Sequence, residues 1–285
     1  MQELDMLILG AGWTSTFLIP LLQSKKCNFA ATTRDGRRVA GVETLQWTFN
    51  PEGTTSAISN QFSSLPLAKA VLITFPLTGE KQSTTLKKGY EEAKQKSEIR
   101  FIQLGSTGIW QIPDQKSIWL SRESPYDTTN KRAVAEDELL GLGGSVLNLA
   151  GLWGGERDPR DWVDRVAKTK EEVKSKKSLH LIHGEDVARA VVALMDNWEK
   201  TRGQRWMLTD GFVYCWWALF AGWGDGKGED TDPKRKPSKQ AQWVYELMQE
   251  EGVQALPRSS EILGRCYDSR EFWSTFSLAP LKARI

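Results

Sequence analysis

The sequence of 285 residues predicts an α/β fold in which helices cover both faces of a parallel sheet. Short apolar runs alternate along the chain with segments whose apolar residues recur at helical spacing, which is the pattern of a doubly wound sheet. Glycines follow directly after the first apolar run. After residue 208 the alternation ends, and an aromatic stretch and then a charged stretch follow. The sequence therefore predicts a sheet domain with a smaller region at its C-terminal end.

The first strand, Met6–Leu9, leads into a turn that suits a phosphate group. Gly10 permits a tight turn, and Gly12 has no side chain that would keep a pyrophosphate from the backbone. Ser15 stands where a third glycine is usual, and it combines a small side chain with a hydroxyl that can donate to phosphate. The apolar residues from 17 to 22 predict a helix whose N-terminus favours an anion. The predicted dinucleotide site of Rossmann type contains Gly10, Gly12, Trp13, Thr14 and Ser15.

The second strand, Asn28–Thr33, ends where a dinucleotide-binding fold holds the residue that selects the adenosine ribose. An acidic residue at that position accepts from the 2′-hydroxyl and repels a 2′-phosphate. Here Arg34 follows Thr33, with two more arginines within the next four residues. Because a guanidinium pairs with a phosphate through two hydrogen bonds, we expect NADP(H) as the cofactor rather than NAD(H). The alternative is that Asp35 takes the acidic role.

Five further apolar runs complete the predicted sheet: Val42–Phe49, Ala70–Phe75, Arg100–Leu104, Ser145–Ala150 and Arg205–Leu208. Helices are expected within residues 78–96, in the second half of residues 121–140, and over residues 187–198. Ligands bind at the carboxyl ends of the strands in such a sheet. The further cofactor contacts expected at that edge are Asn50, Phe75, Pro76 and Gly105.

Residues 1–208 are expected to form the cofactor-binding domain, with residues 151–178 contributing to the substrate region. Residues 209–285 are expected to cap the substrate. Within them, Phe212–Trp223 is rich in aromatic residues, and Asp225–Lys239 carries glycine, proline and charge with no apolar residue. The second of these segments predicts an exposed loop, and the apolar spacing of Gln240–Glu250 predicts a helix.

The composition excludes several classes of protein. A net charge of +2 argues against nucleic-acid binding, and no apolar run is long enough to cross a membrane. Three scattered cysteines indicate a reducing compartment, so a cytoplasmic location is expected. Two histidines without metal-ligand spacing argue against a metal site. The sequence leaves a homodimer open as the oligomeric state.

The motifs, in this order, resemble the extended and atypical short-chain dehydrogenase/reductase superfamily, and more narrowly its divergent epimerase/dehydratase-like proteins. The matching segments are GAGWTS at residues 10–15, the strand-end Arg34, TFP at 74–76, LGSTGIW at 104–110, ESPY at 123–126 with AEDELL at 135–140, LAGLWG at 149–154 and LIHGEDVARA at 181–190. The resemblance implies that Ser106, with Thr107 beside it, holds a substrate carbonyl or alcohol next to the nicotinamide. It also implies structural roles for His183 and Asp186, and we expect Asp186 to cap the helix that follows it.

The Tyr-x-x-x-Lys pair of the superfamily is altered in this sequence. The residue four positions before Lys131 is an aspartate. An alignment on Glu136 places Arg132 at the lysine position and Thr128 at the tyrosine position. Tyr126 lies out of register with either cation, and it reaches the pocket only if it lies on the loop before the helix. The catalytic candidates are therefore Ser106, Thr107, Tyr126 and Lys131.

Three functions follow from a retained cofactor site and an altered proton-transfer pair. The first is an NADP(H)-dependent oxidoreductase that acts on a hydrophobic carbonyl or alcohol, with Tyr126, or Ser106 and water, transferring the proton. The second is a non-redox isomerase, dehydratase or cyclase with the same fold. The third is an NADP-sensing regulatory protein without turnover.

The sequence contains 13 tryptophans, and three of them follow predicted strands or lie in the next loop. These are Trp110, Trp119 and Trp153. We expect them to line an aromatic pocket for a small hydrophobic substrate. The alternative is that they are core residues that pack the domain.

Overall fold

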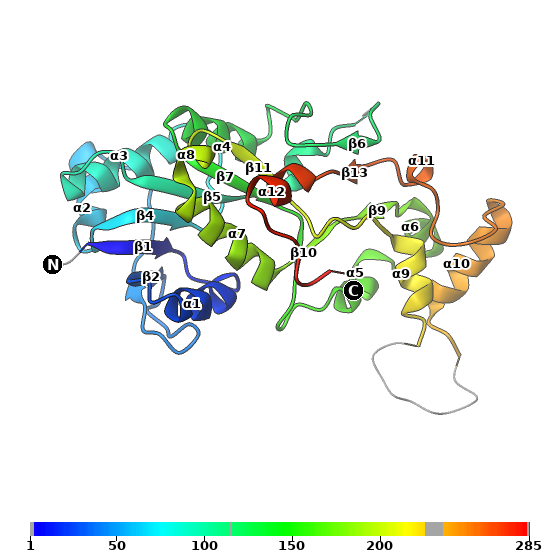
Figure 1. Ribbon diagram of the computed structural model, residues 1–285. Helices are drawn as coiled ribbons and strands as arrows, with labels where there is room; N and C mark the ends of the chain where they lie inside the picture. The colour runs from blue at the N-terminus through cyan, green and yellow to red at the C-terminus, as the bar shows by residue number, and fades with distance from the viewer. Residues whose placement is uncertain (1–2, 114–115, 226–235, 284) are drawn as a thin grey trace.

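The computed structural model describes residues 3–113, 116–225, 236–283 and 285. Seven strands form one sheet in the order β11-β7-β5-β4-β1-β2-β3, and every pairing is parallel (Figure 1). The strands are β1 (Leu4–Leu9), β2 (Phe29–Thr33), β3 (Leu45–Gln46), β4 (Ala68–Ile73), β5 (Arg100–Ser106), β7 (Ser145–Leu149) and β11 (Arg205–Leu208). The predicted doubly wound parallel sheet is confirmed.

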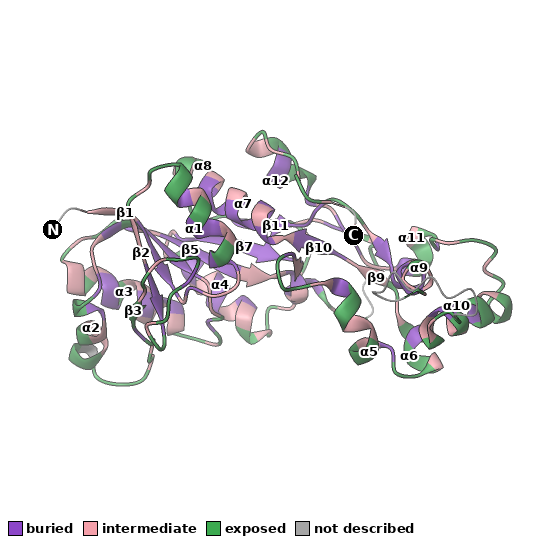
Figure 2. Ribbon diagram, turned by 90° about the horizontal axis from the view of Figure 1, so that it is seen from below, coloured by how far each residue is buried: buried purple, intermediate pink, exposed green. Residues whose placement is uncertain are grey.

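Helices cover both faces of the sheet, as the alternating pattern predicts. Alternate residues of β1 enter different cores, because successive side chains of a strand point to opposite faces. Met6 and Ile8 pack with α1 (Ser15–Ser24) and α7 (Gly184–Asp196). Leu7 and Leu9 pack in the core on the other face. The helices of that face are α2 (Thr55–Ser63), α3 (Gln82–Lys94) and α4 (Lys131–Gly141). Figure 2 shows the central strands buried between the partly exposed helices.

The third strand is shorter than predicted. Only residues 45–46 pair with β2, whereas the sequence predicts a strand over residues 42–49. The backbone N–H and carbonyl of Val39 form hydrogen bonds with the carbonyl and N–H of Val42, which closes a turn before β3 begins. β5 is longer than predicted, because it continues through Ser106 rather than ending at Leu104. Ser106 therefore stands at the carboxyl end of a parallel strand, where ligands bind in such sheets.

A second region, built from segments on both sides of residue 209, is held together by three short strand pairs and a core rich in aromatic residues. The pairs are β8 (Gly151–Trp153) with β10 (Leu181–His183), β9 (Ser178–Leu179) with β12 (Tyr214–Cys215), and β6 (Trp119–Leu120) with β13 (Cys266–Tyr267). The helices are α5 (Val163–Val166), α6 (Lys170–Ser175), α9 (Trp216–Gly222), α10 (Lys239–Glu250), α11 (Ser260–Leu263) and α12 (Arg270–Thr275). Most of the predicted loop 225–239, namely residues 226–235, lies outside the described residues.

The chain returns to the sheet after this region. Phe272 and Trp273 of α12 belong to the same core as α1 and α7. The final segment then runs from α12 past β10 toward α5 (Figure 1). None of the described helices is long and apolar enough to span a bilayer.

Asp186 fixes this final segment and does not cap α7, so that prediction is wrong. The N-cap of α7 is His183, whose Nδ1 accepts from the backbone N–H of Glu185 at 3.1 Å. The carboxylate of Asp186 is fully buried and accepts from the backbone N–H groups of Leu281 and Lys282. The structural role expected for His183 agrees with this geometry.

Candidate cofactor-binding site

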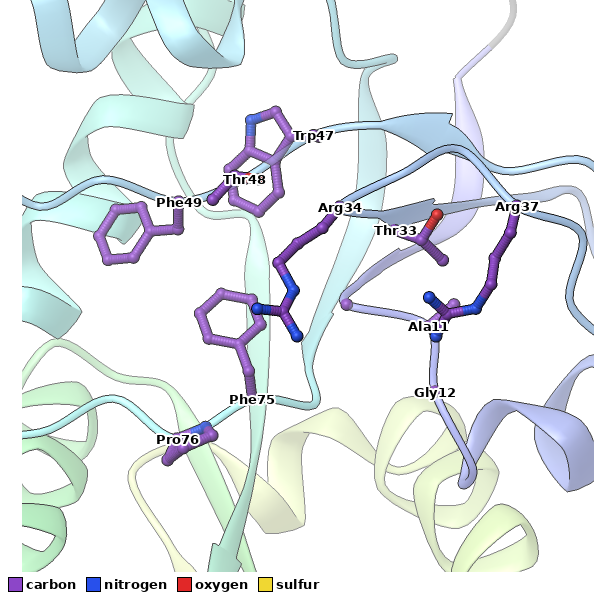
Figure 3. Close-up of a pocket in the computed structure, with 11 residues that line it drawn as sticks. Ala11, Gly12, Thr33, Arg34, Arg37, Trp47, Thr48, Phe49, Phe75 and Pro76 are labelled. Carbon is purple, nitrogen blue, oxygen red and sulfur yellow. The ribbon is translucent and has the colours of Figure 1, made fainter.

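A cavity of about 480 Å³ lies at the carboxyl ends of β1, β2 and β4 (Figure 3). This is the edge of a parallel sheet where ligands bind. The cavity is lined by Gly10, Ala11, Gly12, Thr33, Arg34, Arg37, Trp47, Thr48, Phe49, Phe75 and Pro76. Six of these residues were expected from the sequence to contact the cofactor: Gly10, Gly12, Thr33, Arg34, Phe75 and Pro76.

The glycine turn has the geometry of a phosphate cradle. Gly10 has a φ of +85°, and a Cβ added there would lie 2.8 Å from Cδ1 of Phe75, so only glycine fits. A Cβ added to Gly12 would meet no atom closer than the carbonyl oxygen of Gly10, at 3.8 Å, which leaves that backbone open to a ligand. Among the described residues, the backbone N–H groups of Gly12, Trp13 and Thr14 have no hydrogen-bond acceptor. Such free N–H groups at the start of a helix bind anions.

The side chains of Trp13, Thr14 and Ser15 do not line the cavity. The indole of Trp13 points to the turn after β8, where its Nε1 donates to the carbonyl of Gly154 at 3.1 Å. Thr14 and Ser15 are buried, and the Oγ of Ser15 has no access to solvent. The Ser15 hydroxyl therefore does not face the cavity in this structure, while the expected role of Ser15 in close helix packing agrees with its burial.

Two arginines from the loop after β2 point into the cavity, Arg34 toward the ring of Phe75 and Arg37 toward Ala11 of the glycine turn (Figure 3). Arg37 forms an ion pair with Asp35, with its Nη1 3.1 Å from both carboxylate oxygens. Asp35 does not line the cavity, and its side chain is largely exposed. The hydroxyl of Thr33 is bonded to that of Thr44 at 2.7 Å. Arg34 directly follows this strand end and lines the cavity. Unlike Arg37, it forms no ion pair with a carboxylate of the described residues.

Three aromatic rings form one wall of the cavity, and two of them, Trp47 and Phe49, were not predicted from the sequence. The ring centroid of Phe75 lies 6.4 Å from that of Trp47 and 6.2 Å from that of Phe49. Phe75 is tilted by 46° against Trp47 and by 33° against Phe49, and such an apolar aromatic wall suits contact with a planar base. The predicted contact Asn50 is not part of it, because its Oδ1 accepts from the N–H of Glu52 and closes a local turn. The signal for the wall is the aromatic spacing i, i+2 in the sequence WTF at residues 47–49.

Ser106 and Thr107 stand at the end of β5, as predicted, but their hydroxyls are placed differently. The Oγ of Ser106, which is half-buried, accepts from the N–H of Gly108 at 3.1 Å. The Oγ1 of Thr107 is buried and donates to the carbonyl of Leu149 at 3.3 Å. The Thr107 hydroxyl is thus engaged within the protein, that of Ser106 donates to no described residue, and neither residue lines the cavity.

A buried polar cluster lies beneath Ser106, and Gly105 makes room for it. The Nδ2 of Asn148 donates to the carbonyl of Ser106 at 3.1 Å and to Oε2 of Glu136 at 2.8 Å. Nη2 of Arg205 also donates to this oxygen, at 3.1 Å. A Cβ on Gly105 would lie 2.5 Å from Nδ2 of Asn148, so Gly105 serves this cluster and does not line the cavity. Burial raises the pKa of Glu136.

Tyr126 and Lys131 are not brought together with Ser106. The hydroxyl of Tyr126 donates to Asp137 at 2.8 Å, and the guanidinium of Arg205 lies over its ring at 4.4 Å. Burial raises the pKa of Tyr126, which is the opposite of what a general base needs. Lys131 is the first residue of α4, and its side chain is exposed. The expected proton-transfer role of these two residues has no support in this geometry.

The three tryptophans expected to bind substrate do not form one pocket. Trp110 is fully buried between Tyr126 and Tyr267, and its Nε1 donates to the carbonyl of Ser124, so it is a core residue. Trp119 is 57% exposed on β6. Trp153 is half-buried against the ring of His183, at 4.7 Å.

Comparisons with known proteins support the fold. No protein-family model matches the chain, and no curated protein matches it. Solved structures do match along nearly the whole chain. A functionally unknown conserved protein from Silicibacter pomeroyi is 18% identical, with a TM-score of 0.64 over 99% of this chain and 95% of that one.

Two further structures carry functional names. A UDP-glucose 4-epimerase from Thermotoga maritima, solved with UDP-glucose, is 14% identical with a TM-score of 0.62 over 98% of this chain and 94% of that one. A short-chain dehydrogenase/reductase superfamily protein from Agrobacterium tumefaciens, solved with bound NAD, is 9% identical with a TM-score of 0.61 over 98% of this chain and 93% of that one. The chain therefore has the Rossmann-type fold of the short-chain dehydrogenase/reductase and epimerase structures, in a divergent sequence.

Proposed function

We propose that the protein is an NADP(H)-dependent oxidoreductase that binds its cofactor in the cavity of Figure 3. The residues present fit that group. The glycine turn offers free N–H groups for the pyrophosphate, and the aromatic wall offers apolar rings for contact with adenine. When bound, the nicotinamide would supply or accept a hydride. A structure of the same fold binds NAD, which supports a nicotinamide dinucleotide as the ligand.

The observation that carries the NADP(H) preference is the pair of guanidinium groups at the adenosine end of the cavity. Arg34 and Arg37 both line it, and Asp35, the acidic alternative, is outside it and engaged by Arg37. A 2′-phosphate placed between the two guanidinium groups would be neutralised and hydrogen-bonded by both. The 2′-hydroxyl of NAD(H) would find no carboxylate acceptor among the lining residues.

Ser106 is the residue proposed to hold the substrate. Its Oγ already accepts from Gly108, so the hydroxyl proton is free to donate to a substrate carbonyl. Arg132 lies one helical turn before Glu136 and hence on the same face of α4, which is directed toward the end of β5. We propose that Arg132 replaces the lysine of the superfamily pair. Trp153 remains the aromatic residue offered to a hydrophobic substrate.

A second function, NADP-sensing without turnover, is favoured by one specific observation. The phenol of Tyr126 is bonded to Asp137 and packed under Arg205, so it provides no substitute for the missing general acid. A nicotinamide absorbance assay across hydrophobic aldehydes and ketones separates the two functions. Turnover that falls at least tenfold in Ser106→Ala supports the enzyme, and tight cofactor binding without turnover supports the sensor.

We expect Arg34→Gln to weaken NADP⁺ binding by about tenfold or more and to leave NAD⁺ binding unchanged. The reason is that the variant removes a charge-assisted pair to the 2′-phosphate, which is worth roughly 1.5–3 kcal/mol. Isothermal titration calorimetry with both coenzymes measures the effect. Arg38→Gln is the matched control, because Arg38 pairs with Glu43 and does not line the cavity. Tighter binding of NAD⁺ than of NADP⁺ by the unmodified protein would refute the NADP(H) preference.

A further inference from the structure

The turn after β8 is docked onto the residue that follows Gly12. Gly154 and Arg157 close the turn through two backbone hydrogen bonds, of 2.9 and 3.1 Å. The carbonyl of Gly154 also accepts from Nε1 of Trp13 at 3.1 Å. The guanidinium of Arg157 lies over the indole ring of Trp13, with its Cζ 4.4 Å from the ring. One edge and one face of the same indole are therefore held by this turn.

The base of the turn is fixed, so the side chain of Arg157 is its adjustable part. A Cβ on Gly154 would overlap the imidazole of His183, so the backbone packs directly on that ring. A Cβ on Gly155 would lie 3.4 Å from Cζ of Phe17 and 3.9 Å from Nε1 of Trp13. Arg157 itself is exposed, and its guanidinium lies over the indole of Trp13, the residue after Gly12.

The cation of Arg157 has no anionic partner among the described residues. Neither Glu156 beside it nor any other described carboxylate forms an ion pair with it. The contact of its guanidinium with the indole is a cation–π contact, and the side-chain N–H donors of Arg157 have no hydrogen-bond acceptor among the described residues. The indole that it contacts belongs to Trp13, and the backbone N–H groups of Gly12, Trp13 and Thr14 have no acceptor among the described residues. These groups together are suited to one anion between them.

We infer that Arg157 clamps the pyrophosphate of the bound dinucleotide against the glycine turn, with Trp13 as the platform that orients it. This inference rests on the proposed function, because it takes the dinucleotide as the ligand. It assigns Arg157 a different phosphate from Arg34, which lines the cavity and is proposed to bind the 2′-phosphate. Because the turn continues into residues 158–178 of the substrate region, cofactor binding would also fix the start of that region.

The test compares ligands that carry different phosphates. Calorimetry is run on the full chain, Arg157→Gln and Arg34→Gln with NADP⁺, NAD⁺, ADP-ribose and 2′-AMP. Arg157→Gln is expected to weaken the three pyrophosphate ligands alike, by about tenfold, and to leave 2′-AMP unchanged. Arg34→Gln is expected to weaken NADP⁺ and 2′-AMP only. Arg157→Lys should recover part of the affinity, since it keeps the charge but not the stacked fork.

The controls separate this inference from the proposed function. Arg160→Gln changes an exposed arginine that makes no contact with Trp13, and it should bind all four ligands as the unmodified protein does. Unchanged NADP⁺ affinity in Arg157→Gln would overturn the clamp and leave the proposed cofactor intact. Equal weakening of 2′-AMP and ADP-ribose in that variant would also overturn it, since a general loss of the site would then be the cause. No dinucleotide binding by the unmodified protein would overturn both.

Discussion

Replacing Trp110 by alanine is expected to lower the free energy of unfolding by about 3–5 kcal/mol. The indole is fully buried in a cluster with Leu120, Met207 and Tyr267, and its Nε1 donates to the carbonyl of Ser124. Alanine would leave a cavity in this cluster and an unpaired carbonyl. Urea unfolding followed by circular dichroism measures the loss. The cluster lies apart from the lining of the cofactor cavity, so NADP⁺ affinity at low temperature should stay within about twofold of normal.

The matched control is Trp119→Ala. Trp119 is 57% exposed, so its removal should change the free energy of unfolding by less than about 0.5 kcal/mol. A Trp110→Ala variant of normal stability that had lost only substrate binding would contradict this account. That result would restore the pocket role that the sequence predicted for Trp110.

Replacing Arg205 by leucine is expected to lower the free energy of unfolding by about 3–5 kcal/mol near neutral pH, because it leaves a buried carboxylate without its cation. Glu136 is fully buried and has Asn148 as its other hydrogen-bond donor at the same oxygen. The leucine would also remove the cation over Tyr126 and the partner of Asp137. Urea unfolding of the variant and of the unmodified protein gives the difference.

The pH dependence of that difference has a definite sign. Burial already raises the pKa of Glu136, and loss of the Arg205 cation would raise it further. A carboxyl whose pKa is raised by folding contributes its full stability below the unfolded pKa and loses it as the pH rises through the folded pKa. The loss of unfolding free energy caused by Arg205→Leu should therefore be larger at about pH 8 than at about pH 5.

Glu136→Gln supplies the control for this explanation, since it removes the charge and keeps the acceptor oxygen. In the Glu136→Gln background, Arg205→Leu should cost clearly less than in the unmodified protein, and the pH dependence should flatten. An equal cost in both backgrounds would show that Arg205 acts through packing or through Asp137 instead.

The elements that the sequence predicts well are those whose signals are local. β1, the glycine turn and α1 follow from an apolar run, two glycines and helical spacing, and the structure places them as expected. Arg34, Phe75 and Pro76 also line the cavity at the predicted edge of the sheet, because the carboxyl ends of parallel strands share one edge. The short length of β3 was not predicted. Backbone hydrogen bonds between Val39 and Val42 close a turn there, and apolar periodicity does not reveal such a turn.

The parts of the site that were predicted wrongly depend on tertiary contacts. Trp110 follows β5 in sequence just as a pocket residue would, yet Tyr267, which lies 157 positions later, covers it. The cluster of Glu136, Asn148 and Arg205 joins three separate elements, and no spacing along the chain links them. The contact between Arg157 and Trp13 likewise joins residues that lie far apart in the sequence.

A crystal structure of the protein with NADP⁺ tests the central claim most directly. We predict adenine against Trp47, Phe49 and Phe75, the 2′-phosphate between Arg34 and Arg37, the pyrophosphate at Gly12, and the nicotinamide beside Ser106. Crystals grown at saturating NADP⁺ with no density in this cavity, or with density for the dinucleotide elsewhere on the molecule, would contradict the account.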